Sequence, residues 1–240
     1  MNSLVYIHVP KCGGTSFGSA LRLRYFYSQA TIALSDSRAV QSALDPGARG
    51  VARIKAEYDV RDVMLAQLMA QKYRCISVHA RYHPDLHDRY RATSKFVTLL
   101  RHPVERFLSH YHYLQRHHPS ADRAATLDAF LDSQDAARLG AQYLFYFGRV
   151  LPFETNDLGQ AVETAKTALG QFSLIGDLSR VRSFQKALNA MTGIPIPALR
   201  RNKARVPRHP LDKDLLCKLT AICDPDIAIY DHAQTLRQCA

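Results

Sequence analysis

The sequence lacks any hydrophobic run long enough to cross a lipid bilayer, because a spanning helix needs ~20 apolar residues. No signal-peptide hydrophobic region precedes the first apolar segment either, so we expect a soluble, cytoplasmic protein. The cysteines number only five, an odd count that favours reduced thiols over a disulfide framework. The 240 residues contain no internal repeat and no low-complexity segment. We therefore expect one domain over residues 1–240.

Acidic residues are also scarce, since 21 Asp and Glu face 32 Lys and Arg and leave a formal net charge of +11. A basic surface attracts nucleic acid, an anionic membrane face, a polyanionic glycan or a nucleotide cofactor. The sequence shows neither a nucleic-acid-binding motif nor aromatic residues interleaved with the basic ones. The charge therefore favours an anionic cofactor and fits an acidic acceptor, and we expect no nucleic-acid partner.

Short apolar runs alternate with segments of helical periodicity, as in α/β proteins. Residues 4–9, 73–78, 96–100 and 172–175 are strand candidates. Helical spacing predicts helices over residues 60–70, 104–115, 127–131, 139–147, 158–169, 178–191 and 211–222. We expect an α/β fold with a central parallel sheet flanked by helices on both faces. Ligands of such sheets bind outside the carboxyl ends of the strands.

The first strand candidate leads directly into the segment PKCGGTSF at residues 10–17. Its glycines permit a tight turn, and a helical pattern begins at Thr15 and Ser16. The N–H groups and dipole at a helix start attract a phosphate, to which Lys11 would add an ammonium group. The alternative is a tight turn with an incidental lysine. The segment is no ATP or GTP loop, because its lysine precedes the glycines.

A second segment, RHPVERFLS, follows the strand candidate at residues 96–100. Pro103 suits the first position of a helix. Arg101 is thereby placed at the carboxyl end of a strand, and Ser109 about two turns into the helix. A guanidinium binds phosphate bidentately, so Arg101 and Ser109 could share one phosphate. Alternatively, Arg101 pairs with Glu105 and Ser109 is solvated.

In this order, the two segments resemble sulfotransferases that use 3′-phosphoadenosine 5′-phosphosulfate (PAPS). That family carries P-K-x-x-x-T-S and R-[DN]-P-x-x-R-x-x-S patterns, from which this sequence departs at His102. The resemblance implies a P-loop-like fold, PAPS as cofactor, its product 3′-phosphoadenosine 5′-phosphate (PAP), and no metal. The residues that it assigns to the cofactor are Lys11, Cys12, Gly13, Gly14, Thr15, Ser16, Arg101 and Ser109.

The closest resemblance is to the carbohydrate branch that includes uronyl 2-O-sulfotransferases. It implies a hydroxyl acceptor on a carbohydrate or glycoconjugate. Eukaryotic members of this branch usually carry an N-terminal membrane anchor. Here the first strand begins within a few residues of Met1, so we expect a bacterial enzyme.

His79 closes the strand candidate at residues 73–78 and so lies on the expected ligand side. In the carbohydrate branch, a G-H-x-x-[FY] segment here supplies the base that takes the acceptor proton. His79 and Tyr82 match it, although Val78 replaces the glycine. The resemblance thus implies that His79 and Lys11 are catalytic; the alternative is a histidine that merely caps the strand. Candidates for the acceptor side are Arg81, Tyr82 and His83.

Other histidines offer alternatives. The spacing of His79, His83 and His87 would suit metal ligands on one helix, but Pro84 would break that helix, and we expect no metal. If His79 is not the base, His110 or His112 is the next candidate.

Residues 195–208 are rich in proline and basic side chains. In the family, a loop at this place closes over the cofactor, so Lys203 and Arg205 are further cofactor candidates. The alternative is a solvated basic linker.

The resulting prediction is in-line transfer of a sulfuryl group from PAPS to a hydroxyl, with His79 as base. One rival function is a P-loop small-molecule kinase, although the sequence lacks the G-K-[ST] ending. The other rival is a basic polyanion-binding module without catalysis.

Overall fold

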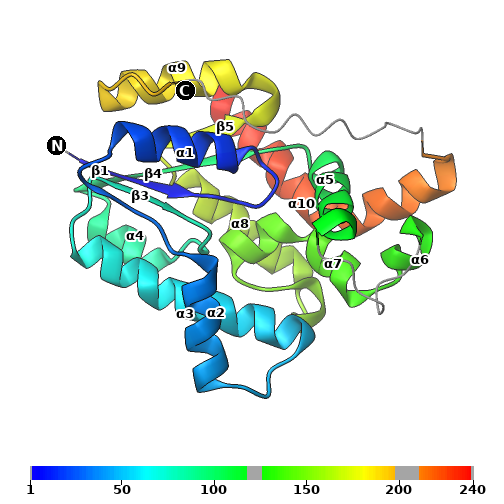
Figure 1. Ribbon diagram of the computed structural model, residues 1–240. Coiled ribbons are helices and arrows are strands. Elements are labelled where there is room, and N and C mark those ends of the chain that lie inside the picture. The colour runs from blue at the N-terminus through cyan, green and yellow to red at the C-terminus, as the bar shows by residue number, and fades with distance from the viewer. Residues whose placement is uncertain (1, 118–125, 198–210, 239–240) are drawn as a thin grey trace.

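A computed structural model describes residues 2–117, 126–197 and 211–238 and arranges them around a five-stranded sheet (Figure 1). The strand order is β2-β3-β1-β4-β5, and every pairing is parallel. The predicted α/β fold is therefore confirmed. The strands are β1 (Ser3–Ile7), β2 (Gln29–Ala30), β3 (Cys75–Val78), β4 (Ser94–Leu100) and β5 (Leu174–Asp177).

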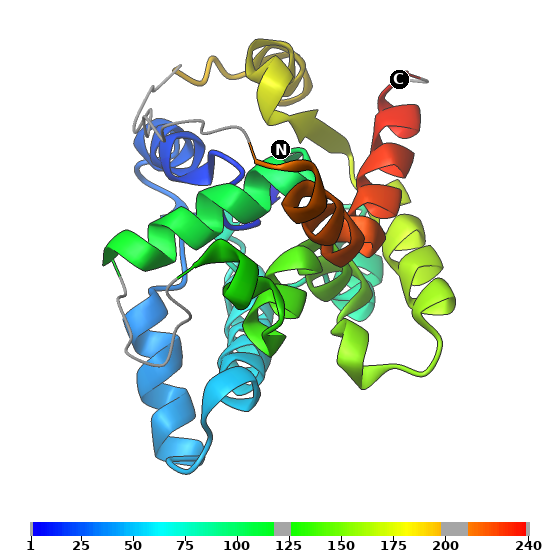
Figure 2. The ribbon, with the colours of Figure 1, turned by 90° about the vertical axis from the view of Figure 1, so that its right-hand side faces the viewer.

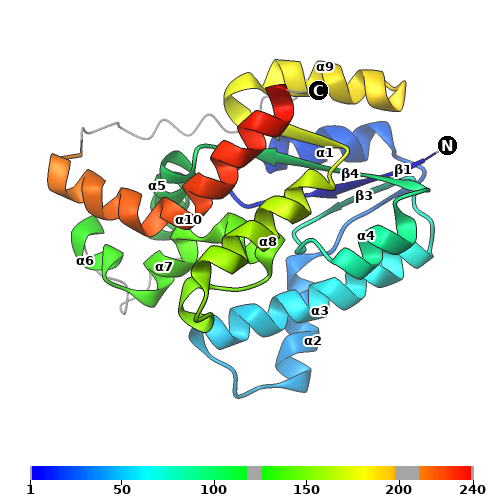
Figure 3. The same ribbon diagram turned by 180° about the vertical axis from the view of Figure 1, so that it is seen from behind.

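Helices cover both faces of the sheet (Figures 1 and 3). The α-helices are α1 (Gly14–Arg24), α2 (Leu34–Leu44), α3 (Gly50–Ala70), α4 (Pro84–Tyr90), α5 (Pro103–His117), α6 (Leu127–Leu131), α7 (Gln134–Gly140), α8 (Leu158–Gly170), α9 (Val181–Thr192) and α10 (Lys213–Gln238). Single turns of other types are η1 (Leu144–Gly148), η2 (Pro152–Glu154) and η3 (Leu178–Arg180). None of the described helices is both long and apolar enough to span a membrane.

Strand β1 lies at the centre of the sheet, and its side chains contribute to two hydrophobic cores, one on each face of the sheet. Leu4 and Tyr6 pack in the core with residues of α1 and α9. Val5 and Ile7 point the opposite way, into the core that includes residues of α3 and α8. Side chains of a strand alternate between the two faces, and a strand buried on both faces reads as a continuous apolar run. This explains why the sequence pattern identified β1.

A third core lies beyond the carboxyl ends of the central strands. It joins α5, α6, α7 and the first half of α10 through buried residues such as Phe107, Leu139 and Leu219. Figure 2 faces this end of the molecule, where α5, α7 and α10 lie together. Packing in this third core therefore anchors helix α5 next to the carboxyl ends of β1 and β4.

The strand register places three connecting segments at one edge of the sheet. Ile7 is paired with Val78 of β3 on one side and with Thr98 of β4 on the other. The segments that follow β1, β3 and β4 consequently begin side by side. These are the segments in which the sequence placed Lys11, His79 and Arg101.

Three sequence predictions about helices need correction, and the first is the helix predicted over residues 60–70, which begins at Gly50 as α3. Residues 139–147 do not form one helix, because α7 ends at Gly140 and a π-helical turn, η1, follows. The last helix is also longer than the predicted 211–222, since α10 continues through Pro225 to Gln238.

Candidate active site

The loop from His8 to Gly13 joins β1 to α1 and has a strongly curved backbone. Lys11 and Gly13 adopt left-handed conformations, with φ of 67° and 78°. Helix α1 then begins at Gly14. Curved backbone of this kind, followed by a helix N-terminus, forms a concave surface of N–H groups that suits an anion. The side chains of Thr15 and Ser16 lie outside the described part of the structure.

Lys11 is half-buried and lies among other cations. Its Nζ is 4.0 Å from the centroid of the Tyr113 ring. Burial lowers the pKa of Lys11, and the nearby guanidinium groups of Arg116 and Arg101 lower it further. Among the described residues, no carboxylate pairs with Lys11. Three positive charges thus converge at the loop, and an anion would relieve their repulsion.

Arg101 follows β4 and faces the same loop. Its backbone N–H donates to the hydroxyl of Tyr143 at 2.8 Å. Its Nε pairs with Glu105 at 3.2 Å, so the ion pair of the alternative interpretation does form. Both side chains of that pair are partly exposed, and a ligand phosphate can replace such a carboxylate at low cost. Ser109 lies further along α5 and is half-buried.

Cys12 supports the loop from inside the protein. Its Sγ is buried and lies 3.5 Å from the Tyr143 hydroxyl. Burial raises the pKa of the Cys12 thiol to about 11, so the thiol stays protonated. Its predicted contact with the cofactor is therefore restricted to the backbone. The Tyr143 hydroxyl also donates to the Arg101 carbonyl, which ties the two predicted segments together.

A buried ion pair behind this junction was missed at the sequence level. Arg106 and Asp226 are fully buried, with 3.7 Å between Nη2 and Oδ2. Asp226 also accepts backbone N–H groups of Tyr143 and Leu144 at 2.8 Å and 3.0 Å. Arg106 could have been found, since it is the second arginine of the R-x-P-x-x-R pattern. Its partner in α10 carries no comparable sequence signal.

His79 follows β3 and lies against the ring of His8, with 3.9 Å between ring centroids. Its Nδ1 is buried and has no hydrogen-bond partner in the described part of the chain. Burial lowers the pKa of His79 to about 4; Arg61 adds to this effect, whereas a hydrogen bond with the His8 backbone opposes it. At neutral pH the ring is uncharged, the form required of a proton acceptor.

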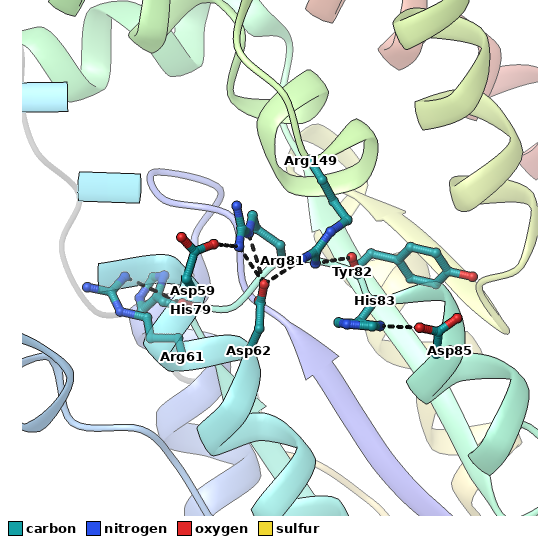
Figure 4. Close-up of polar contacts among 9 residues, drawn as sticks. All are labelled: Asp59, Arg61, Asp62, His79, Arg81, Tyr82, His83, Asp85 and Arg149. Carbon is teal, nitrogen blue, oxygen red and sulfur yellow. Dashed lines mark hydrogen bonds and ion pairs between the residues drawn. The ribbon is translucent and has the colours of Figure 1, made fainter. Parts of the chain in front are cut away.

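The predicted acceptor residues lie in a different environment (Figure 4). Arg81 is 3% exposed and forms ion pairs with Asp62 and Asp59, each at 2.5 Å. Arg149 binds the same Asp62 at 2.8 Å and donates to the Tyr82 carbonyl. With its guanidinium already engaged, Arg81 has a structural place between α3 and the segment after β3. An acceptor role for it stays a prediction that these contacts disfavour.

Tyr82 and His83 also contact other parts of the fold. The Tyr82 ring packs against His87 and Phe172, and His83 lies 3.9 Å from Asp85 at the start of α4. Helix α4 begins at Pro84, so no helix joins His79 to His83 and His87. Within the described residues, no group of three potential ligands could hold a metal ion. The predicted contacts of Lys203 and Arg205 lie outside the described residues.

His110 is a histidine of α5 that lies near the proposed base. Its Nδ1 is buried and has no hydrogen-bond partner among the described residues. Burial lowers the pKa of His110, and the positive charges of Arg106, Arg138 and Lys11 act in the same direction, as does His79. Lys11 thus lies near Arg101, and His110 lies near both Lys11 and His79, whereas the guanidinium of Arg81 is engaged by Asp59 and Asp62.

Comparisons with known proteins bear on the family and the fold of the chain. Residues 1–141 match the Sulfotransferase family. A sulfotransferase from Alicyclobacillus acidocaldarius has a similar fold, with a TM-score of 0.52 over 98% of this chain and 95% of that chain at 15% identity. Mouse sulfotransferase SULT7A1 complexed with PAP gives a TM-score of 0.43 at 14% identity, over 93% of this chain and 63% of that chain. No curated protein sequence matches the chain.

Proposed function

We propose that this chain, which belongs to the sulfotransferase family, transfers a sulfuryl group from PAPS to a hydroxyl of a carbohydrate. Sulfuryl transfer follows from the family; the donor, the acceptor and the roles of individual residues are our proposal. One observation carries it. Lys11, Arg101 and His79 come from three separate segments and lie at the same edge of the sheet.

The charges at this edge fit a nucleotide with two phosphate groups. Lys11 and the loop amides would hold the 5′-phosphosulfate at the start of α1, together with Thr15 and Ser16. Arg101 and Ser109 would hold the 3′-phosphate. PAPS, when bound, supplies the sulfuryl group and a phosphate leaving group. Lys203 and Arg205 remain candidates for further contacts with it.

The chain's own residues then have distinct tasks. His79 takes the proton of the acceptor hydroxyl as the acceptor oxygen bonds to sulfur. Lys11 neutralises the negative charge that grows on the bridging oxygen as the sulfur–oxygen bond breaks. The loop amides would stabilise the 5′-phosphate, which would depart with the electron pair of that bond. The atoms and electrons of the transfer balance with PAPS and the acceptor alcohol alone, so no further reactant is needed.

The acceptor class follows from the charge of the chain and from its family resemblance. Resemblance to uronyl 2-O-sulfotransferases and the formal charge of +11 favour an acidic carbohydrate. We further propose that the enzyme is bacterial and acts in the cytoplasm. Acceptor contacts would come from the His110 side of the site, since Arg81 is occupied by carboxylates.

A thermal-shift panel separates this proposal from its rivals. PAP without magnesium should stabilise the protein, a P-loop kinase would need ATP with magnesium, and a polyanion-binding module would respond to heparin alone. Labelled-sulfate transfer from PAPS to a carbohydrate panel then tests the activity, with the His79→Ala variant as blank. Labelling of phenols or amines with no carbohydrate product would overturn the acceptor class. Stabilisation by magnesium-ATP alone would overturn the function.

A further inference from the structure

Two imidazole rings touch at the edge of the sheet where β1 and β3 end. The pairing of Ile7 with Val78 makes the next residues, His8 and His79, neighbours. The His8 backbone N–H continues the ladder by donating to the Val78 carbonyl at 2.8 Å. The rings lie 3.9 Å apart between centroids, with 33° between their planes. This contact follows from the register of β1 and β3, and it involves a histidine to which no sequence motif assigned a role.

The His8 ring is itself held on two further sides. The Tyr6 ring lies nearly parallel to it, with 5.6 Å between centroids and 10° between planes. On another side is Gly14, where an added Cβ would lie 1.7 Å from Nε2 of His8. Only a glycine at this position leaves room for the ring. His8 is buried, so its ring has a defined position from which to act on a neighbour.

We infer that His8 is a positioning residue for His79, which its ring holds by direct contact. The inference rests on the proposed function, in which His79 is the base. Nδ1 of His79 is buried and has no hydrogen-bond partner among the described residues. The His8 ring, 3.9 Å away between centroids, is therefore the contact that orients the base.

Two arginines and a further imidazole act on the pair, and one of these arginines, Arg61, is itself paired with the buried Glu57 at 3.0 Å. Arg22 from α1 and Arg61 from α3 act on His79, and His110 faces it from α5. Burial lowers the pKa of His8, and His79, Arg22 and Lys11 lower it further. Both rings are therefore uncharged at neutral pH. Loss of the His8 ring would admit water to His79 and move its pKa upward, towards the usual value of about 6.5.

The test compares His8→Ala with His8→Phe, which keeps an aromatic ring. We expect His8→Ala to lower kcat by about a hundredfold, the cost of a misplaced group, and to leave PAP affinity within about threefold. NMR titration should show a higher pKa for His79, and the acid limb of the kcat profile should move with it. His8→Phe should recover at least tenfold of the lost kcat and keep the low pKa. The matched control is His87→Ala, which removes another buried imidazole, packed against Tyr82 and Phe96, and should leave the pH profile unchanged.

The outcomes separate the inference from the proposed function. Wild-type protein that fails to bind PAP, or a His79→Ala variant that keeps its turnover, contradicts the proposed function. A His8→Ala variant that binds PAP with wild-type kcat, pH profile and His79 pKa overturns the positioning role alone. If His8→Ala does not fold, His8→Phe decides: a pKa of His79 that rises in spite of the ring also overturns it.

Discussion

Two groups of cations in this molecule differ in what neutralises them. At the carboxyl edge of the sheet, Lys11 has no carboxylate partner in the described chain, and Arg101 has only the exposed Glu105. Next to α3, Arg81 and Arg149 share the buried carboxylate of Asp62. The first group is therefore free to bind an anionic ligand, whereas the second holds the fold together.

Solvent exposure explains why the two groups should respond differently to mutation. The side chains of Arg101 and Glu105 are 26% and 57% exposed, and such pairs contribute about 0–1 kcal/mol. The side chains of Arg81 and Asp62 are 3% and 8% exposed, and removing one member of a buried pair costs about 3–5 kcal/mol. An arginine of the first kind is expected to affect binding, and one of the second kind stability.

The largest effect is expected at Lys11. Lys11→Ala should lower kcat by about a hundred- to a thousandfold, because it removes a donor that stabilises charge in the transition state. Thermal stability should barely change. Lys55→Ala provides the control, since Lys55 pairs with Glu154 at 2.7 Å on the α3 side and should leave kcat unaltered. Equal losses of kcat in the two variants would contradict the catalytic role of Lys11.

Arg81→Met tests the second group. The free energy of unfolding, measured by urea denaturation, should fall by about 3 kcal/mol, because Asp62 loses Arg81, the buried one of its two arginine partners. PAP affinity of the folded variant should stay within about twofold of wild type. If stability is unchanged while affinity for an acceptor drops, Arg81 binds the acceptor after all.

Arg101→Ala should affect PAP binding and not stability, the reverse of what is expected for Arg81→Met. Losing a bidentate, charge-assisted contact worth about 1.5–3 kcal/mol should weaken PAP binding ten- to a hundredfold. The unfolding free energy should change by less than about 1 kcal/mol. As a matched control, Glu105→Gln leaves Arg101 free and should not weaken PAP binding. Weaker binding in both variants would show that the ion pair, and not the arginine, supports the site.

A smaller effect is expected in the acid dependence of stability. Burial lowers the pKa of His79 to about 4 in the folded protein, below the usual value of about 6.5. The unfolded chain therefore binds this proton more tightly, and stability present above pH 6.5 is lost as the pH falls towards 4. His79→Gln should show a shallower decline between pH 7 and pH 4 in denaturation curves. Parallel curves for the variant and wild type would mean that His79 is not buried as a neutral ring.

Much of the fold was predictable because its main elements have local signals. Strand β1 is buried on both faces and reads as an apolar run, and α5 begins at a proline. Other elements were missed for equally local reasons. Strand β2 has only two residues, and the buried residues of α2 are the polar Ser37 and Gln41. The π-helical turn after α7 depends on Asp226, which comes from a distant part of the sequence.

The residues of the candidate site could likewise be predicted only where the local sequence carries a signal. The motifs place Lys11 and Arg101 on one edge because the carboxyl ends of parallel strands meet there. Arg81 became an acceptor candidate only because it lies close to His79 in the sequence. Adjacent residues can point to different partners, and the side chain of Arg81 reaches Asp62 on α3. The contact between His79 and His8 was equally hidden, since it arises from the register of two strands.

Calorimetry with PAP and with adenosine 5′-monophosphate tests the central claim most directly. The two ligands differ only in the 3′-phosphate, the group assigned to Arg101 and Ser109. PAP should bind ten- to a hundredfold more tightly, since a charge-assisted phosphate contact contributes about 1.5–3 kcal/mol, and magnesium should have no influence. Equal affinity for the two nucleotides would contradict the claim that the cations at this edge form a site for a nucleotide with two phosphate groups.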